Sequence, residues 1–200
     1  SSPLAHMWPK IKKRCPGMSM QVVSFENTPD AARGLANLGQ DMDVVVGVFD
    51  DAFLRERSCA GLEFSREPLC CAVPVESDLA SLDKITLSDL HDHSLLLIRR
   101  GWNVDNDALR DEILESHPQI NLVDFPQYRA EVFNQCANED LTLATLALWG
   151  GVHPMLKTLP TDWECSVSYG LLHSPEPAEH VREFLEAIKE VLDEQLLEGK

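Results

Sequence analysis

Strand-like and helix-like segments alternate along this chain in two separate series, and this pattern limits the fold more than any other feature. Alternating strands and helices are typical of mostly parallel sheets with right-handed crossovers. The first series comprises a helix at residues 3–14, a strand at 18–25, a helix that Thr28 caps and a β-branched strand at 44–48. The second comprises a strand at 95–98, a helix from Asn103, a strand at 120–123, a helix at 127–137 and an apolar run at 141–146.

The doubled pattern predicts an α/β fold of two Rossmann-like subdomains. Two stretches have the composition of connections between them, at residues 68–75 and 165–173. An amphipathic helix predicted at residues 177–198 follows the second connection, so we expect it to return to the first subdomain. We therefore expect two crossing strands, at about residues 72–76 and 166–171.

The charge balance excludes one class of function for this chain by itself. Its 17 Lys and Arg against 33 Asp and Glu give a formal net charge of −16, and such a surface repels the phosphate backbone that a nucleic-acid binder must neutralise. No run approaches the roughly 18 apolar residues of a membrane span, and no signal peptide opens the sequence. The six cysteines form no CxxC pair. These features predict a reduced, cytoplasmic protein without a membrane partner.

Motifs for cofactor and hydrolase chemistry are absent, since no GxGxxG, phosphate-binding loop, HExxH or GxSxG occurs. The sequence therefore predicts no cofactor. His91 and His93 flank Asp92 and could bind a metal, but histidines two apart share a face only on a strand, so we interpret this stretch as a solvated loop. Asp50 and Asp51 follow a predicted strand and could be catalytic carboxylates. With no nucleophile or histidine nearby in sequence, a loop or helix-cap role is favoured.

Several predicted helix N-termini favour an anionic ligand. In a doubly wound sheet such termini converge on the crevice at the strand ends, where their free N–H groups bind carboxylates or phosphates. Arg99 and Arg100 directly follow the strand at 95–98, and arginine binds carboxylates bidentately. The alternative, that both arginines form surface salt bridges on an acidic protein, stays open. The helix starts concerned are Ser1–Ser2, Thr28, Arg99–Gly101 and Pro126–Gln127.

Residues 66–90 resemble the hinge region of LysR-type transcriptional regulators. The shared elements are "EPL" at 67–69, an apolar strand that ends in Val73-Pro74, then Leu79-Ala80, "ITL" at 85–87 and Asp89-Leu90. Upstream and downstream, the matching elements are Trp8-Pro9, Pro16, the strand from Asp43 and Tyr169-Gly170-Leu171-Leu172. Each motif is weak alone, but their order and spacing are specific, and they cover nearly the whole chain.

The chain departs from the family pattern at three places. Ser77–Asp78 stand where His-Pro is usual, Asn138-Glu139-Asp140 replace a glycine-rich turn, and residues 149–163 resemble only a subgroup. These departures affect the identity of the ligand rather than the fold. The first strand, the winged helix-turn-helix and the linker helix of the family are not among these residues.

The resemblance implies a type 2 periplasmic-binding-protein fold, with regulatory subdomain I at residues 1–73 and 172–200 and subdomain II at 74–171. It implies a ligand-sensing domain, not an enzyme, that binds a small-molecule effector between the subdomains. The helix N-termini and the two arginines indicate that this effector is a carboxylate. The other expected partners are further copies in a homodimer or tetramer, and DNA only through the missing N-terminal domain. By matched position, the expected ligand-binding residues are Ser1, Ser2, Phe49, Arg99, Arg100, Gln127 and Tyr169.

The family implies dimers that pair through the first helix and the helix of the second subdomain. Leu4, Trp8 and Ile11 give the first helix more apolar surface than one buried face requires. Two other functions remain open at this point. A secreted or periplasmic solute-binding protein would share the fold, and an enzyme on a two-lobed α/β fold would use Asp50 or Asp51 as acid or base.

Overall fold

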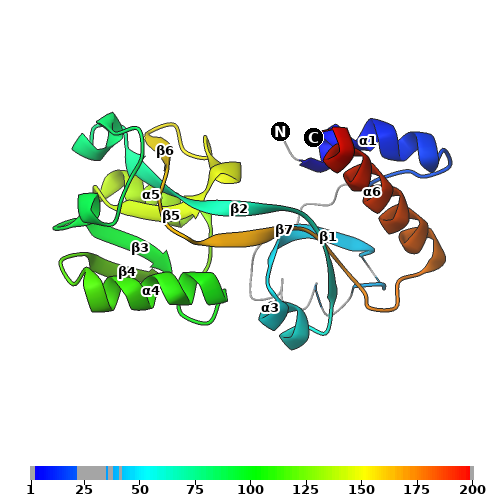
Figure 1. The fold of residues 1–200 in the computed structure, drawn as a ribbon, viewed down its shortest axis with the longest axis horizontal. Helices are drawn as coiled ribbons and strands as arrows, with labels where there is room; N and C mark the ends of the chain where they lie inside the picture. Colours follow the sequence, from blue (N-terminus) through cyan, green and yellow to red (C-terminus); the bar gives the residue numbers. More distant parts are fainter. Residues whose placement is uncertain (1–2, 22–34, 36–37, 41, 199–200) are drawn as a thin grey trace. The chain divides into compact units, whose positions relative to one another are not determined.

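The computed structural model describes residues 3–21, 35, 38–40 and 42–198, which belong to two compact units (Figure 1). Unit 1 comprises residues 1–65 with 169–200, and unit 2 comprises residues 66–168. The chain enters unit 2 within strand β2 (Ala60–Pro74) and leaves it within strand β7 (Ser166–His173). These are the two crossing strands of the predicted α/β fold. The unit boundaries lie several residues before the expected ones at residues 73 and 171.

Unit 2 is built on a mixed sheet. Strand β3 (Ser94–Ile98) pairs in parallel with β4 (Asn121–Phe125) and with β5 (Thr142–Leu146). Strand β2 pairs antiparallel with β5 and with β6 (Leu156–Pro160). Within unit 2 the hydrogen-bonded order is β2-β5-β3-β4, with β6 beside β2.

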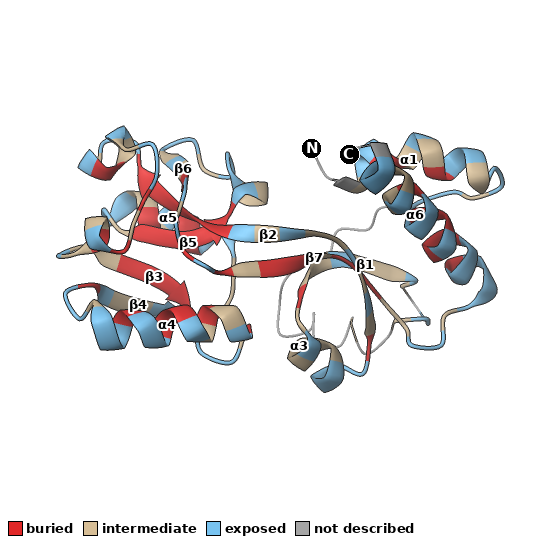
Figure 2. Ribbon diagram, in the orientation of Figure 1, coloured by how far each residue is buried: buried red, intermediate tan, exposed pale blue. Residues whose placement is uncertain are grey.

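Both faces of β3 are covered, because its residues 95–98 are fully buried (Figure 2). Leu96 and Ile98 pack in one cluster with Val132, Phe133 and Cys136 of helix α5 (Ala130–Asn138). Alternate residues of a strand point to opposite faces, so Leu95 and Leu97 point away from this cluster. Helix α4 (Val104–Ser116) also packs against β3. A continuously apolar strand covered on both sides is typical of a parallel α/β sheet.

Helix α4 starts at the residue that the sequence predicts. Asn103 has extended backbone, and its side-chain oxygen accepts the N–H groups of Asp105 and Asn106 at 2.9 and 3.2 Å. Such a cap satisfies N–H groups that have no partner inside the helix. The helix therefore begins directly after the loop that follows β3, which fixes the loop at both ends.

Unit 1 is held together by two helices that lie side by side, α1 (Pro3–Arg14) and α6 (Glu179–Glu198) (Figure 1). Met7 and Ile11 of α1 are buried against a stripe of α6 that includes Phe184 and Ile188. Trp8 and Leu4 pack against the same core but are only half-buried, so part of each side chain stays exposed on α1. The final helix thus belongs to the first unit, as the sequence predicts.

Strand β1 (Val44–Phe49) neighbours β7 and leads into helix α3 (Asp51–Glu56). Asp50 caps α3, since its carboxylate accepts the N–H of Phe53 at 2.7 Å. This confirms the helix-cap role. Three short 3-10 helices complete the described elements: η1 (Asp78–Ser81), η2 (Ser88–Leu90) and η3 (Ala147–Trp149). Most of the predicted strand at 18–25 and the helix start at Thr28 lie outside the described residues.

Candidate functional site

The carboxyl ends of β3 and β4 place two of the expected ligand-binding residues on neighbouring loops of unit 2. The two strands run in parallel register, with Ile98 opposite Phe125. The pairing continues one residue further, because the Arg99 N–H donates to the Phe125 carbonyl at 2.9 Å. Gln127 follows two residues later and is half-buried. Ligands of open α/β sheets bind at this edge, outside the carboxyl ends of the strands.

The loop after β3 is fastened to α4 by two acidic side chains. The Arg100 guanidinium is paired with the Asp111 carboxylate. The Gly101 N–H donates to both carboxylate oxygens of Asp107, at 3.0 and 3.1 Å. Gly101 has φ of +87°, a left-handed conformation that favours glycine. Asp107 and Asp111 are four residues apart and therefore share one face of the helix.

The two arginines of this loop differ in their partners. The hydrogen bond with Asp111 raises the pKa of Arg100 and lowers the pKa of Asp111, so the Arg100 charge is balanced within the chain. Arg99 is exposed, and its side chain makes no hydrogen bond or ion pair with any residue that the structure describes. Arg100 thus forms the kind of surface salt bridge that was the alternative to a ligand contact. The charge of Arg99 is not balanced by any described residue.

A third arginine, which the sequence analysis did not single out, lies buried beneath this loop. Nη2 of Arg110 donates to the carbonyls of Ile98 at 2.7 Å and Leu97 at 3.4 Å. Nη1 forms an ion pair with Asp124 of β4 at 2.7 Å. The only sequence signal for this role is a cation between two buried apolar residues of a helix, and such a position predicts no specific partner.

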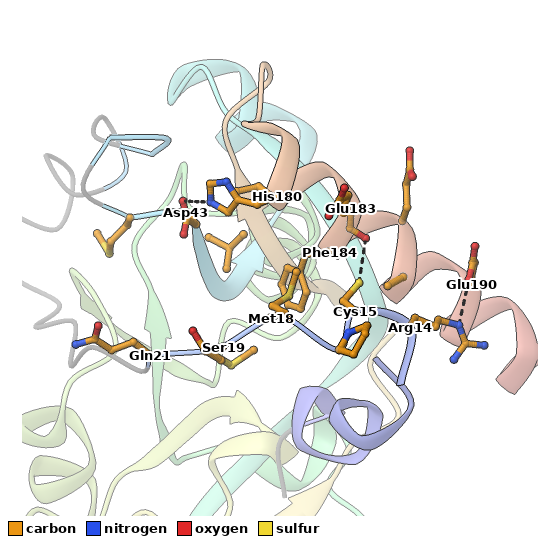
Figure 3. Close-up of a pocket in the computed structure, with 18 residues that line it drawn as sticks. Arg14, Cys15, Met18, Ser19, Gln21, Asp43, His180, Glu183, Phe184 and Glu190 are labelled. Carbon is orange, nitrogen blue, oxygen red and sulfur yellow. Dashed lines mark hydrogen bonds and ion pairs between the residues drawn. The ribbon is translucent and has the colours of Figure 1, made fainter. Parts of the chain in front are cut away.

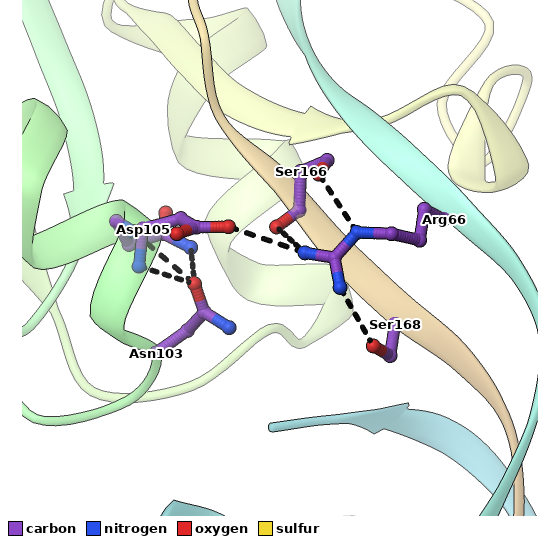
Figure 4. A network of polar contacts seen from close by, with 6 residues as sticks. Arg66, Asn103, Asp105, Ser166 and Ser168 are labelled. Atoms are coloured by element: carbon purple, nitrogen blue, oxygen red, sulfur yellow. Dashed lines mark hydrogen bonds and ion pairs between the residues drawn. The ribbon is translucent and has the colours of Figure 1, made fainter. Parts of the chain in front are cut away.

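Arg66 forms a second network that sequence reasoning missed (Figure 4). Its Nε donates to Ser166 Oγ at 3.2 Å and its Nη1 to Ser168 Oγ at 3.3 Å. Its Nη2 lies 3.4 Å from the carboxylate of Asp105, beside the Asn103 cap. The network ties β2, β7 and the first turn of α4 together inside unit 2. The three contacts involve residues far apart in sequence, so no local motif reports them.

Aromatic side chains gather around Tyr128, just after β4. The ring of Tyr128 packs against Trp149, Phe125 and Trp102 with centroid separations of 4.4, 4.9 and 5.6 Å. Its hydroxyl donates to the Ala144 carbonyl at 2.7 Å. Burial raises the pKa of Tyr128, so the hydroxyl remains a hydrogen-bond donor at physiological pH. Phe125 is the last residue of β4, so the cluster lies directly beside the loop that carries Gln127.

A cavity of about 1120 Å³ lies within unit 1, between α6 and the residues that follow α1 (Figure 3). Its charged lining includes Asp43, Glu183, Glu186 and Glu190 against one arginine, Arg14. The Arg14 guanidinium is already paired with α6, at 3.0 Å from Glu190 and also with Glu194. The surplus of carboxylates makes this cavity unfavourable for an anionic ligand.

The remaining expected site residues belong to unit 1. Phe49 ends β1 and is buried with Cys59 and Leu172. Tyr169 of β7 is half-buried, and its ring meets the edge of Phe64 with centroids 6.3 Å apart. Ser1 and Ser2 lie outside the described residues. The structure thus brings Arg99, Arg100 and Gln127 to one edge of unit 2 and leaves Phe49 in the core of unit 1.

His91, in the loop before β3, pairs with a distant histidine and not with His93, its neighbour in sequence. Nε2 of His91 lies 2.9 Å from Nδ1 of His117, at the end of α4. Their ring centroids are 5.2 Å apart, which places the two nitrogens between the rings and suits a direct N–H···N hydrogen bond. Among the described residues, no three His, Cys, Asp or Glu side chains group in a metal-binding arrangement.

Comparison with known protein families shows which family the chain belongs to. A family model described as the LysR substrate binding domain matches residues 1–193. The chain belongs to this family. A search of curated protein sequences found no significant match. No helix in the described part of this LysR substrate binding domain is long and apolar enough to cross a membrane.

Solved structures share the fold of this LysR substrate binding domain. The oxidized form of OxyR matches with a TM-score of 0.62 and 18% identity, over 94% of this chain and 87% of that chain. The effector binding domain of QuiR in complex with shikimate gives 0.67 and 12%, over 92% and 87%. The probable amino-acid ABC transporter extracellular-binding protein ytmK from Bacillus subtilis gives 0.65 and 15%, over 99% and 84%. These likenesses confirm the type 2 periplasmic-binding-protein fold.

Proposed function

We propose that this chain is the ligand-sensing domain of a LysR-type transcriptional regulator and that Arg99 binds the carboxylate of a small organic effector. The observation that carries the proposal is the exposed Arg99 guanidinium. It has no partner in the described part of the chain, although that chain holds an excess of 16 negative charges. A cation left unbalanced in such a chain, at the carboxyl end of a parallel strand, is suited to an anion from outside.

Two further features of unit 2 support an anionic effector. Arg129 stands at the N-cap position of α5, on the loop that follows β4, and is exposed. Gln127 lies on the same loop and offers an amide that can hydrogen-bond a carboxylate or hydroxyl. The effector thus has two loops of neighbouring strands to contact. That the effector lies between the two subdomains, with Ser1, Ser2, Phe49 and Tyr169 also in contact, is the part of the proposal that comes from the family.

The proposed mechanism is binding without turnover. A ligand shifts a conformational equilibrium only by its differential affinity for the two states. In the regulator, effector binding changes how the subdomains and the copies of a homodimer or tetramer are arranged. This in turn changes how the attached N-terminal domains meet DNA in the cytoplasm. Asp50 caps α3, so it is already engaged in a structural role and is a poor candidate for a catalytic acid or base.

The test is a thermal-shift screen of carboxylates and neutral analogues, followed by calorimetry with Arg99→Ala. Shikimate, the ligand of the QuiR structure, is included in the panel. A charge-assisted contact to arginine contributes about 1.5–3 kcal/mol, and 1.4 kcal/mol is a factor of ten in affinity. Arg99→Ala should therefore weaken binding by roughly ten- to a hundredfold.

Arg100→Ala is the matched control, because it removes a neighbouring cation that Asp111 already balances. Its effect on affinity should be less than about threefold, since exposed ion pairs contribute little. Equal binding by wild type and Arg99→Ala would contradict the role of Arg99. Stabilisation by neutral or cationic compounds alone would contradict the anionic effector.

A further inference from the structure

We propose that Arg110 is a positioning residue that sets where Arg99 lies, and so controls anion binding without touching the ligand. This inference rests on the proposed function of Arg99. Arg110 is 7% exposed, and it reaches the last two residues of β3 through their backbone carbonyls. Arg99 is the next residue along the chain.

The Arg110 guanidinium bridges β3 and β4 at residues that lie opposite each other in the sheet. Leu97 of β3 is opposite Asp124 of β4 in the parallel register. Arg110 bonds the Leu97 carbonyl and pairs with the Asp124 carboxylate, at 3.4 and 2.7 Å. A planar guanidinium with fixed donor directions is well suited to bridging two such groups, whereas a lysine ammonium is a single flexible point charge. The separation of the two loops that carry Arg99 and Gln127 therefore depends on this side chain.

Three anchors on α4 hold the loop after β3. Asp107 binds the Gly101 N–H, Asp111 binds the Arg100 side chain, and Arg110 binds the backbone at Leu97 and Ile98. Arg110 and Asp111 lie three and four residues after Asp107, so both are neighbours of Asp107 on the helix surface. Arg99 is flanked by anchored residues on both sides, but its own side chain remains available. This is the arrangement expected of a pre-organised contact, which loses little entropy on binding.

Stability alone is a poor explanation for the buried guanidinium. Nε of Arg110 is buried and donates no hydrogen bond within the described residues. Its carboxylate partner on Asp124 is 62% exposed. Taking a charge out of water costs more than an imperfectly satisfied, half-solvated ion pair returns, so an apolar side chain of similar length could pack there at least as well. The specific consequence of Arg110 is geometric.

The test compares amide hydrogen exchange by NMR in the wild type, Arg110→Met and Arg110→Lys. We expect the Arg99 amide to exchange about five- to tenfold faster in Arg110→Met than in the wild type, relative to the amide of Leu96 inside the sheet. Arg110→Lys should restore part of the protection. A purely structural role would speed exchange of both amides by the same factor. Equal acceleration, or no change at Arg99, overturns the proposal.

Ile113→Val is the matched control, because it alters the buried face of α4 without touching the loop. It should leave the ratio of the two exchange rates unchanged. If Arg110→Met does not fold, Asp124→Asn removes the exposed partner of the guanidinium and should raise the same ratio by a smaller factor. An unchanged ratio in Asp124→Asn then overturns the proposal.

Acetate, the simplest carboxylate probe, separates this inference from the proposed function. We expect acetate to shift the Arg99 Nε–H resonance in the wild type, with at least fivefold weaker binding in Arg110→Met and partial recovery in Arg110→Lys. If acetate moves no Arg99 resonance in the wild type, the anion contact is wrong, while the exchange ratio still decides the role of Arg110. If acetate binds the wild type and Arg110→Met equally, the positioning role is wrong and the anion contact stands.

Discussion

Thr86 and Asp89 form reciprocal hydrogen bonds where the chain enters η2. The Asp89 carboxylate accepts the Thr86 N–H at 2.8 Å and the Thr86 hydroxyl at 2.7 Å, while the Asp89 N–H donates to the Thr86 hydroxyl at 3.3 Å. These bonds favour the ionised carboxylate and hold the pKa of Asp89 below its ordinary value. The turn that leads into β3 therefore depends on a charge.

The first prediction follows from this pair. The pKa of Asp89 is lower in the folded state, so its stabilisation is fully present above the unfolded-state pKa of about 3.9 and is lost as pH falls through the folded-state value. Asp89→Asn should lower the free energy of unfolding by about 0.5–1 kcal/mol at pH 7, and by much less at low pH. Urea denaturation at both pH values measures this. Asp83→Asn, an exposed control, should change little, and a pH-independent loss in Asp89→Asn would contradict the explanation.

The second prediction concerns close strand packing in unit 1. A Cβ added at Gly170 of β7 would lie 2.0 Å from the carbonyl oxygen of Leu62 in β2. Backbone cannot yield as a flexible side chain does, so Gly170→Ala should lower the free energy of unfolding by roughly 3 kcal/mol. Among the described residues, a Cβ added at Gly47 of β1 meets only the Leu172 side chain, at 4.0 Å. Gly47→Ala should stay within about 1 kcal/mol of wild type in the same denaturation experiment. Similar losses in both variants would refute the packing argument.

The third prediction is that the cysteines differ in reactivity. Burial raises the pKa of Cys136 and of Cys165 to about 12, and it also raises the pKa of Cys71. Only the thiolate reacts, so these thiols should be inert in the folded protein at pH 8. Cys15 is half-buried and should be modified first by a thiol reagent. Absorbance at 412 nm with Ellman's reagent should show one fast thiol that Cys15→Ser removes, and all six only in urea. A fast phase that survives in Cys15→Ser would contradict this assignment.

The fourth prediction concerns self-association through α1 and α4, as the family implies. Leu114 of α4 is 59% exposed, so its side chain is available on this helix as an apolar contact for a second copy. Light scattering should show dimers, and Leu114→Glu should shift them to monomers. Val152→Glu is the control, since Val152 is 53% exposed in unit 2 but lies outside α4. A monomer in the wild type at tens of micromolar, or dimers that Leu114→Glu leaves intact, would count against the interface for this fragment.

Helix caps and strands that depend on neighbouring residues could be predicted from the sequence. Asn103 and Asp50 are helix caps whose partners lie within three residues, so their roles could be predicted from neighbouring residues. The strand at Val44–Phe49 could be predicted because most of its residues are β-branched valines. The first half of β2, from residue 60, was missed, because alternating polar residues there resemble a loop as much as a strand.

The site was harder to predict, because its decisive contacts are tertiary. Arg99 and Arg100 are adjacent residues of the same type, so the sequence gives no reason to treat them differently. They differ because Asp111 of α4 forms an ion pair with Arg100. His91 pairs with His117, 26 residues distant, rather than with His93. Arg110 occupies a position on the buried face of α4 where a sequence pattern predicts an apolar residue, and its backbone partners on β3 leave no mark in the sequence.

The placement of the four tryptophans makes the two units separately visible by fluorescence. Trp8 is in unit 1, half-buried against α6, whereas Trp102, Trp149 and Trp163 are all in unit 2. Replacing the three by phenylalanine leaves one fluorophore that reports on unit 1 alone. Replacing Trp8 instead leaves emission from unit 2, where Trp102 and Trp149 lie against Tyr128 beneath the proposed anion contact. Comparing the melting curves of the two variants then distinguishes cooperative from independent unfolding of the two units.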